Sequence, residues 1–291
     1  MNRYERIPPI RRARGYRLYA DGGLRYLDMW LQDGRAIGGH APQRVRRAFE
    51  NTLARGQAGA LPGRWKRRLE RALASMTGCT GPWELFTSAE AVHMVLDRSF
   101  GRAGWCVVDP VDPVGPDDLC AGEAGVPASI ELFRPLLSTP DSSRSGALLV
   151  PVPVMIGSGL YALLLPGASS GATAIHSGVP GMGQPPSEPL LSAAVRAVYD
   201  VIDAQGRRPA REAELRPVYR AFDDSSLWHR AGPYVKPLLP DAAYDALFTR
   251  FLDAKVVLSP RTGGVSFVPQ ELSPGERAGI VRLVQDTERS S

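Results

Sequence analysis

Residues 154–160 read Val-Met-Ile-Gly-Ser-Gly-Leu, and residues 183–190 read Gly-Gln-Pro-Pro-Ser-Glu-Pro-Leu. The apolar run Ala147 to Val150 predicts a buried strand before the first stretch, and Tyr161 to Leu165 predicts another strand after it. Apolar residues at helical spacing predict a helix from Leu190 to Ile202. Buried strands, a glycine-rich turn and a helix in this order favour an α/β fold.

The N-terminal region carries a hairpin signal. Residues 16–28 predict two alternating strands on either side of Asp21-Gly22-Gly23, a pattern typical of antiparallel strands joined by a tight turn. After His40-Ala41-Pro42, apolar residues with a period of 3.6 predict a helix towards Arg55.

Residues 64–100 predict a helix, a strand and a second helix. The first helix runs from Trp65 to Met76, the strand from Trp83 to Thr87, and the second helix from Ala89 to Phe100. Ser88 precedes the second helix and is a good N-cap residue. The basic residues from Arg64 to Arg71 lie on a helical pattern, so a solvated helix face is favoured over a nucleic-acid patch.

Residues 104–146 are harder to interpret. Trp105 to Val108 predicts a buried strand. The Pro/Asp-rich loop 109–118 could suggest a metal site. Its acidic residues match no calcium-loop spacing, and alternate prolines keep them from converging, so we expect no metal.

The C-terminal region starts after a break at residues 206–209. It predicts a helix from Ala242 to Phe251 and a final helix from Pro274 towards Glu288. Lys255 to Pro260 predicts a strand, and we expect Val265 to Val268 to be its antiparallel mate across Thr262-Gly263-Gly264.

These segments together resemble class III aminotransferases, the pyridoxal-phosphate (PLP) enzymes related to glutamate-1-semialdehyde aminomutase. That family has a similar N-terminal hairpin, followed by a Gly-His-x-x-Pro turn into a helix. It also reads Lys-x-Ile-Gly-Gly-Gly-Leu where this chain has residues 154–160, and Gly-Thr-Phe-x-Gly-Asn-Pro-Leu at residues 183–190. The C-terminal pattern resembles the small domain of the family.

The resemblance implies a PLP-transferase fold of type I. We expect a small α+β domain built from both chain ends and a reduced, mostly parallel sheet in a large domain. The expected boundaries are 1–68 for the N-terminal segment of the small domain, 69–205 for the large domain and 206–291 for the C-terminal small domain.

Several residues that the family uses for PLP differ here. Val154 stands where the resemblance places the Schiff-base lysine, and the only lysines of the chain are Lys66, Lys236 and Lys255. The loop that would cradle the cofactor phosphate keeps Thr87 and Ser88 but loses its glycine. Gln184 replaces the threonine that reaches the phosphate across a dimer. No strand ending in Asp-Glu, which would supply the carboxylate for the pyridine nitrogen, is recognised.

The resemblance therefore implies that catalytic residues are absent. By the resemblance, Thr87, Ser88 and Gln184 would be the remnant of its phosphate site, although the N-cap role of Ser88 is favoured. We expect no resident cofactor, although residual PLP or phosphate binding is compatible with these residues.

Composition and cysteine content narrow the class of protein and its expected compartment. Hydrophobic residues make up 44% of 291 residues, no apolar run is long enough to cross a membrane, and the N-terminus lacks a signal core. Three scattered cysteines predict free thiols in a reducing cytoplasm. The partners we expect are a second copy of the chain or a related aminotransferase, and a small metabolite, with neither nucleic acid nor membrane.

Three functional hypotheses remain open. The first is a degenerate aminotransferase that binds a metabolite or partner, a pseudoenzyme. The second is an enzyme with an atypical site that uses PLP without a covalent link or has reassigned chemistry. The third is an interaction module whose cleft has closed.

Overall fold

The computed structural model describes residues 2–58, 63–102, 104–113, 128–138, 141, 146–157, 159–165 and 185–289. They form two compact units. Unit 1 combines Met1–Pro42 with Asp203–Ser291, and unit 2 is the continuous segment Gln43–Ile202. Residues 43–68, which we expected in the small domain, are therefore grouped with unit 2.

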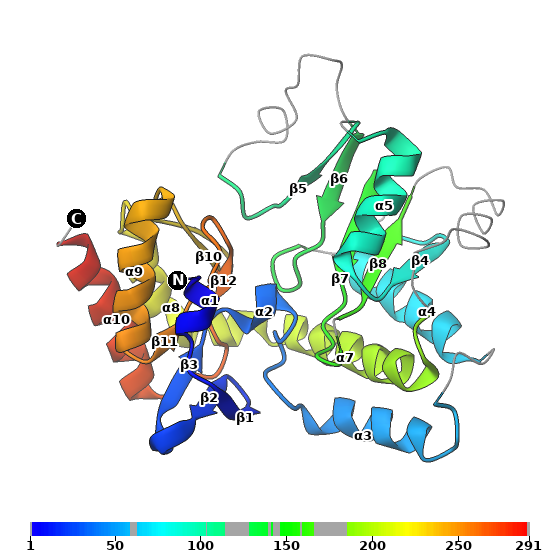
Figure 1. Cartoon of the computed structure of the whole chain (residues 1–291), viewed down its shortest axis with the longest axis horizontal. Coiled ribbons are helices and arrows are strands. Elements are labelled where there is room, and N and C mark those ends of the chain that lie inside the picture. The colour runs from blue at the N-terminus through cyan, green and yellow to red at the C-terminus, as the bar shows by residue number, and fades with distance from the viewer. Residues whose placement is uncertain are drawn as a thin grey trace. The chain divides into compact units, whose positions relative to one another are not determined.

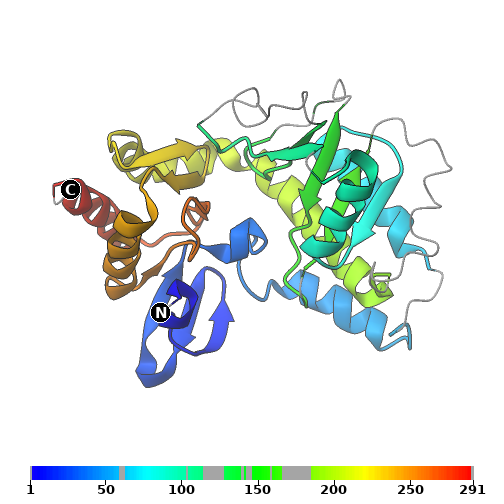
Figure 2. The same cartoon turned by 45° about the horizontal axis from the view of Figure 1, so that its top comes forward.

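Unit 1 is built from both ends of the chain, as expected (Figures 1 and 2). Its elements are α1 (Arg3–Arg6), β1 (Ile10–Arg14), β2 (Arg17–Ala20), the 3₁₀ turn η1 (Asp21–Gly23), β3 (Arg25–Asp28), α2 (Leu31–Gly34), α8 (Arg208–Asp223), β9 (Trp228–Ala231), β10 (Tyr234–Pro237), α9 (Asp241–Asp253), β11 (Val256–Val257), β12 (Ser266–Phe267) and α10 (Pro274–Glu288).

A four-stranded sheet in the order β1-β2-β3-β11 joins the two chain ends. The predicted hairpin forms between β2 and β3, and Gly22 takes the positive φ of 69° that its turn requires. β11 pairs parallel to β3, with Val256 opposite Leu27. A strand from the far end of the chain thus completes the N-terminal sheet.

The expected pairing of the last two strands is wrong. β12 pairs with β10, with Phe267 opposite Tyr234, in a second sheet of order β12-β10-β9. The rings of Tyr234 and Phe267 meet edge to face at 5.1 Å, and both side chains are buried. Burial of this aromatic pair gives β12 a better partner than the adjacent two-residue strand β11.

The turn after β3 is strained and firmly held. Leu31, Gln32 and Asp33 have φ values of 47°, 48° and 62°, which residues other than glycine rarely adopt. The buried Asp28 carboxylate accepts hydrogen bonds from the backbone N–H groups of Trp30 and Leu31, both at 2.9 Å. These bonds, together with full burial of Leu31, stabilise the turn against its strain.

Unit 2 contains a five-stranded sheet of order β4-β8-β7-β6-β5 with helices around it. Its elements are α3 (Gln43–Leu53), α4 (Trp65–Thr77), β4 (Trp83–Phe86), α5 (Ala89–Phe100), β5 (Trp105–Val108), β6 (Ala128–Leu132), β7 (Ala147–Pro151), β8 (Tyr161–Leu164) and α7 (Glu188–Gly206), whose last residues belong to unit 1. β5, β6 and β7 are parallel, whereas β8 runs antiparallel to both β7 and β4.

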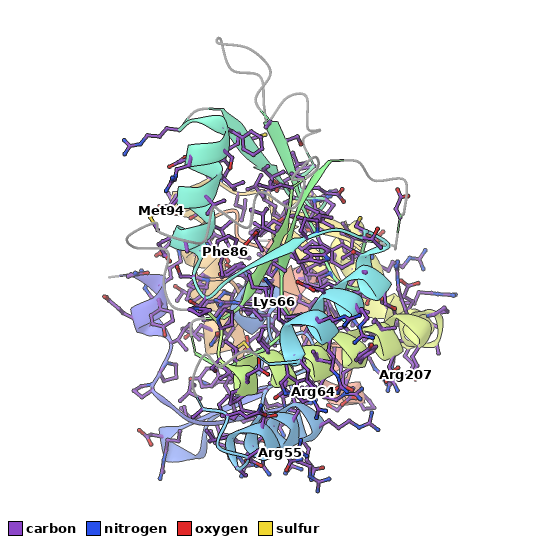
Figure 3. The ribbon with its side chains drawn as sticks, turned by 90° about the vertical axis from the view of Figure 1, so that its right-hand side faces the viewer. Arg55, Arg64, Lys66, Phe86, Met94 and Arg207 are labelled. Atoms are coloured by element: carbon purple, nitrogen blue, oxygen red, sulfur yellow. The ribbon has the colours of Figure 1, made fainter. Side chains whose placement is uncertain are left out.

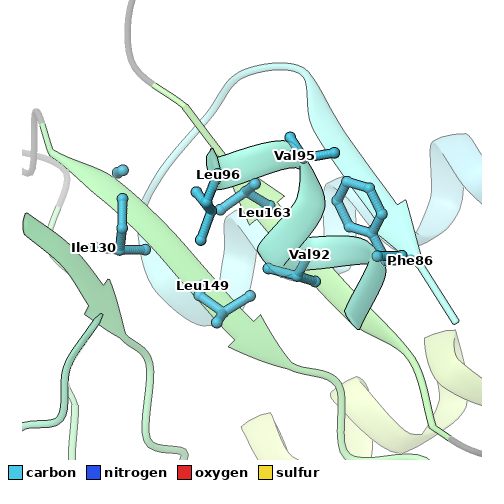
Figure 4. Close-up of a cluster of buried hydrophobic side chains, with 9 residues drawn as sticks. Phe86, Val92, Val95, Leu96, Ile130, Leu149 and Leu163 are labelled. Carbon is cyan, nitrogen blue, oxygen red and sulfur yellow. The ribbon is translucent and has the colours of Figure 1, made fainter. Parts of the chain in front are cut away.

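The sheet has a compact apolar core under α5 (Figure 4). Val92, Val95 and Leu96 of α5 pack with Phe86, and with further buried residues of the strands, Ile130, Leu149 and Leu163. Fully burying an aliphatic or aromatic side chain stabilises a fold by about 1.5–3 kcal/mol, so this cluster anchors α5 firmly. The mixed helices and sheets confirm the predicted α/β fold class.

The cysteines depart from the expectation in part. Cys79 is a buried free thiol, but Cys106 is disulfide-bonded, so the prediction of free thiols was wrong for Cys106. Within the part of the chain that the structure describes, no helix combines the length and apolar character needed to cross a membrane.

Candidate functional site

Four strands of unit 2 end at the same edge of the sheet. β5, β6 and β7 are parallel, and β4 shares their direction because both β4 and β7 are antiparallel to β8. Ligands of open α/β sheets bind outside the carboxyl ends of the strands. We therefore take the residues that follow these four ends as the candidate site and call them the carboxyl edge.

A buried ion pair joins the ends of β5 and β6. The guanidinium of Arg134 donates two hydrogen bonds to the carboxylate of Asp109, one of them from Nε to Oδ1 at 3.0 Å and the other from Nη2 to Oδ2. The side chains are only 9% and 14% exposed. The N–H of Val111 also donates to Asp109 Oδ1, at 3.1 Å. The negative charge of Asp109 is therefore balanced by Arg134 within the protein.

This ion pair was not predicted from the sequence. β6 lies between residues 109 and 146, the interval in which we recognised no strand ending in Asp-Glu. Ile130 and Leu132 alternate with Ser129 and Glu131, which was the available signal. β6 is followed by Phe133 and Arg134 and carries no Asp-Glu pair at its end.

The connection after β7 is apolar, and its residues 152–154 and 159–160 are buried. Val154 is 1% exposed, and its N–H donates to the carbonyl of Val152 at 2.7 Å. The N–H of Val152 donates to the carbonyl of Leu160 at 2.9 Å, and both of these side chains are fully buried. No amine lies on this connection, because its sequence contains no lysine.

The three lysines lie elsewhere. Lys66 is exposed on α4 of unit 2 (Figure 3). Lys236 lies on β10, and Lys255 directly precedes β11, both in unit 1. None of them lies on the connection between β7 and β8.

At the start of α5, next to the end of β4, polar groups already form hydrogen bonds with one another. Ser88 is the N-cap of α5, and its hydroxyl oxygen accepts a hydrogen bond from the N–H of Ala91 at 3.2 Å. Hydrogen bonds from its own backbone N–H and from the Ser88 side chain lower the pKa of Glu90. Thr87 is half-buried beside Ser88, so these two predicted residues lie together at the carboxyl edge. Gln184 lies outside the described residues.

These residues do not fit a PLP group held as a Schiff base. Such a group needs an amine and a carboxylate for its ring nitrogen. The carboxyl edge offers the apolar Val154 and a carboxylate already paired with Arg134.

Comparison with solved structures shows an aminotransferase-like fold. A transaminase with PLP bound is 14% identical with a TM-score of 0.71, and the match covers 97% of this chain and 90% of that chain. Glutamate-1-semialdehyde aminomutase from Pseudomonas aeruginosa PAO1 is 16% identical with a TM-score of 0.66, over 96% of this chain and 86% of that one. An omega-transaminase from Sphaerobacter thermophilus is 14% identical with a TM-score of 0.66, over 97% and 91%. Identities this low establish the fold and not an activity.

Sequence comparison finds relatives without a described activity. An uncharacterised protein of Treponema pallidum (strain Nichols) is 29% identical over an alignment of length 299. The alignment covers 91% of this chain and 90% of that protein. An uncharacterised protein of Borreliella burgdorferi is 38% identical over 64 residues, covering 22% and 24%. No protein-family model matches the chain. The predicted resemblance to class III aminotransferases is confirmed at the level of the fold.

Proposed function

We propose that this chain has lost PLP-dependent transamination and acts as a binding or partner subunit with an aminotransferase-like fold. The observation that carries the proposal is the burial of Val154 after β7, where the resemblance places the Schiff-base lysine. An imine to an aldehyde cofactor requires a primary amine, and a valine side chain has none. The ion pair of Asp109 with Arg134 supports the same conclusion, because a carboxylate engaged there is not free to pair with a pyridine nitrogen.

Incubation with PLP tests the loss of catalysis. We expect no stoichiometric aldimine absorbance and no transamination half-reaction with amino acids. Because the chain has only Lys66, Lys236 and Lys255, a variant with all three changed to arginine provides a matched control that keeps every charge. A borohydride-fixed adduct on one lysine, abolished in this variant and accompanied by transamination, would contradict the proposal.

A second candidate is PLP or phosphate binding without a covalent link. It is favoured by Ser88 at the N-terminus of α5, since helix N-termini attract anions. Thr87, Ser88 and Gln184 would supply the polar contacts. A thermal-shift screen separates the candidates, because a ligand that binds the native state raises the melting temperature. Stabilisation by phosphate and PLP would favour this candidate, stabilisation by amino acids alone would favour a metabolite-binding subunit, and no response would favour a pure interaction module.

The partner we propose is a second copy of the chain or a related aminotransferase. The support is the resemblance, since sites of that family form between subunits. Light scattering during size-exclusion chromatography measures the mass directly. A monomer at micromolar concentration that also fails to associate with a related aminotransferase would contradict this proposal.

A further inference from the structure

Unit 1 contains a cavity of about 600 Å³ between the β3–β11 strand pair and α10. Volumes of roughly 300–1,000 Å³ are typical of pockets that bind small molecules. All of its lining residues belong to unit 1, so the cavity is separate from the carboxyl edge of unit 2.

The floor of the cavity is apolar. Leu27 of β3, Val256 of β11 and Ile280 of α10 line it, and each is less than a tenth exposed. An apolar surface of this kind favours a ligand with a hydrocarbon or aromatic body, which is released from water when it binds.

Two glycines of α10, Gly275 and Gly279, line the cavity. A Cβ atom built at Gly275 or Gly279 would meet no atom within 4 Å, and neither residue has a positive φ. Close packing and backbone geometry therefore do not require glycine at either position. Glycine inside a helix is less favourable than alanine by about 0.8–1.0 kcal/mol, so at Gly279 the helix is weakened and the cavity stays open.

Three exposed cationic side chains lie at the rim of the cavity. Arg25, Lys255 and Arg282 line the cavity, and none of them takes part in an ion pair with any residue that the structure describes. The carbonyl of Lys255 accepts the N–H of Leu27 at 2.8 Å, and its ammonium lies 5.1 Å from the ring centre of Tyr26. These contacts hold Lys255 at the strand pair.

The lining also contains two acids, of which Glu276 is firmly paired and Asp286 is more exposed. Glu276 forms an ion pair with Arg17 at 2.5 Å, and Asp286 contacts Arg289 at 3.9 Å. Burial opposes ionisation of Glu276, but hydrogen bonds from Arg17 and Ser273 outweigh it and lower its pKa. Since Arg17 balances Glu276, the cations Arg25, Lys255 and Arg282 outnumber the remaining acid Asp286, and the net charge of the lining is positive.

We propose that this cavity binds an organic anion, namely a carboxylate or phosphate group attached to an apolar body. The apolar body lies on the floor formed by Leu27, Val256 and Ile280, and the anionic group faces Arg25, Lys255 and Arg282. This site is independent of the function proposed for the carboxyl edge.

Calorimetric titration of the full chain tests the proposal with four probes. Octanoate and octyl phosphate share the required chemistry, octanol lacks the charge, and inorganic phosphate lacks the apolar body. We expect binding of at least one octyl anion, weaker binding of octanol and of inorganic phosphate, and weakening by salt because the rim is exposed. The stronger of the two octyl anions identifies the head group.

Three variants locate the binding. Gly279→Leu places an isobutyl group in the cavity and should weaken binding, whereas Ala278→Leu adds the same side chain to an exposed position of α10 outside the lining and should leave binding unchanged. Removing one rim charge with Arg282→Gln should weaken binding by up to about fivefold, as expected for an exposed ion pair. The Arg282→Gln result stands even if Gly279→Leu fails to fold. Octyl anions that bind no better than octanol, or that bind Gly279→Leu and Arg282→Gln as tightly as the original chain, would overturn the proposal.

Discussion

Replacing Arg134 by leucine tests whether its ion pair with Asp109, at the carboxyl edge of unit 2, is buried and stabilises the fold. The substitution leaves the Asp109 carboxylate 14% exposed and without its cationic partner. Removing one partner of a buried ion pair costs about 3–5 kcal/mol, because the remaining charge stays desolvated. Asp109 keeps the hydrogen bond from Val111, so we expect the lower end, about 3 kcal/mol. Replacing both partners by leucine should cost less than Arg134→Leu alone, since no charge is then left buried.

Urea denaturation and calorimetry measure the effect. A loss of about 3 kcal/mol corresponds to a fall in Tm of roughly 6–12 °C for a unit of this size. Arg220→Leu is the matched control, because the Arg220–Asp224 pair spans 3.9 Å and its side chains are 80% and 74% exposed, so little change is expected. A cost below about 0.5 kcal/mol for Arg134→Leu would refute the reasoning, because a solvated ion pair has a cost of this size.

Substitutions at three further positions test other parts of the structure. Glu276→Gln should destabilise unit 1 by about 1–2 kcal/mol at neutral pH. The folded pKa of Glu276 lies below its ordinary value of 4.5, so its contribution is present above that pH and is lost as the pH falls through the folded pKa. Urea midpoints of both proteins should therefore converge in acid, and a pH-independent difference would contradict this. Ser88→Ala should cost about 1 kcal/mol in thermal denaturation by removing the N-cap of α5, whereas Ser88→Asp should restore the cap. Val154→Lys should destabilise unit 2 by about 3 kcal/mol or more, since it puts an amine at a buried site, and it should not yield a PLP adduct. A stable, yellow Val154→Lys protein would show that the edge can still accept the cofactor.

Elements with a strong periodic or capping signal could be predicted from the sequence. α5 and α10 match their predictions because apolar residues recur at helical spacing and serine N-caps mark their starts. The hairpin of β2 and β3 follows from Asp21-Gly22-Gly23. Val154 can likewise be read from the sequence, but only the resemblance indicates that a Schiff-base lysine is expected at its position.

Features decided by tertiary contacts could not be predicted. β12 has two residues and no periodicity, and its pairing depends on the distant Tyr234. The Asp109–Arg134 pair depends on two parallel strands ending side by side, which the sequence does not specify. The positive φ of Leu31 conflicts with its local preference and is held by the Asp28 carboxylate. The cavity beside α10 arises between segments that are remote in sequence.

The parallel pairing of β11 with β3 has a consequence for synthesis on the ribosome. Leu27 emerges early, but its partner Val256 follows only after all of unit 2 has been made. At 5–20 residues per second, β3 waits on the order of ten seconds or more with an uncovered edge. An uncovered strand edge is a template for aggregation, so the nascent chain passes through its most vulnerable state while unit 2 folds. Release of a chain that ends before Val256 would leave that edge permanently unpaired.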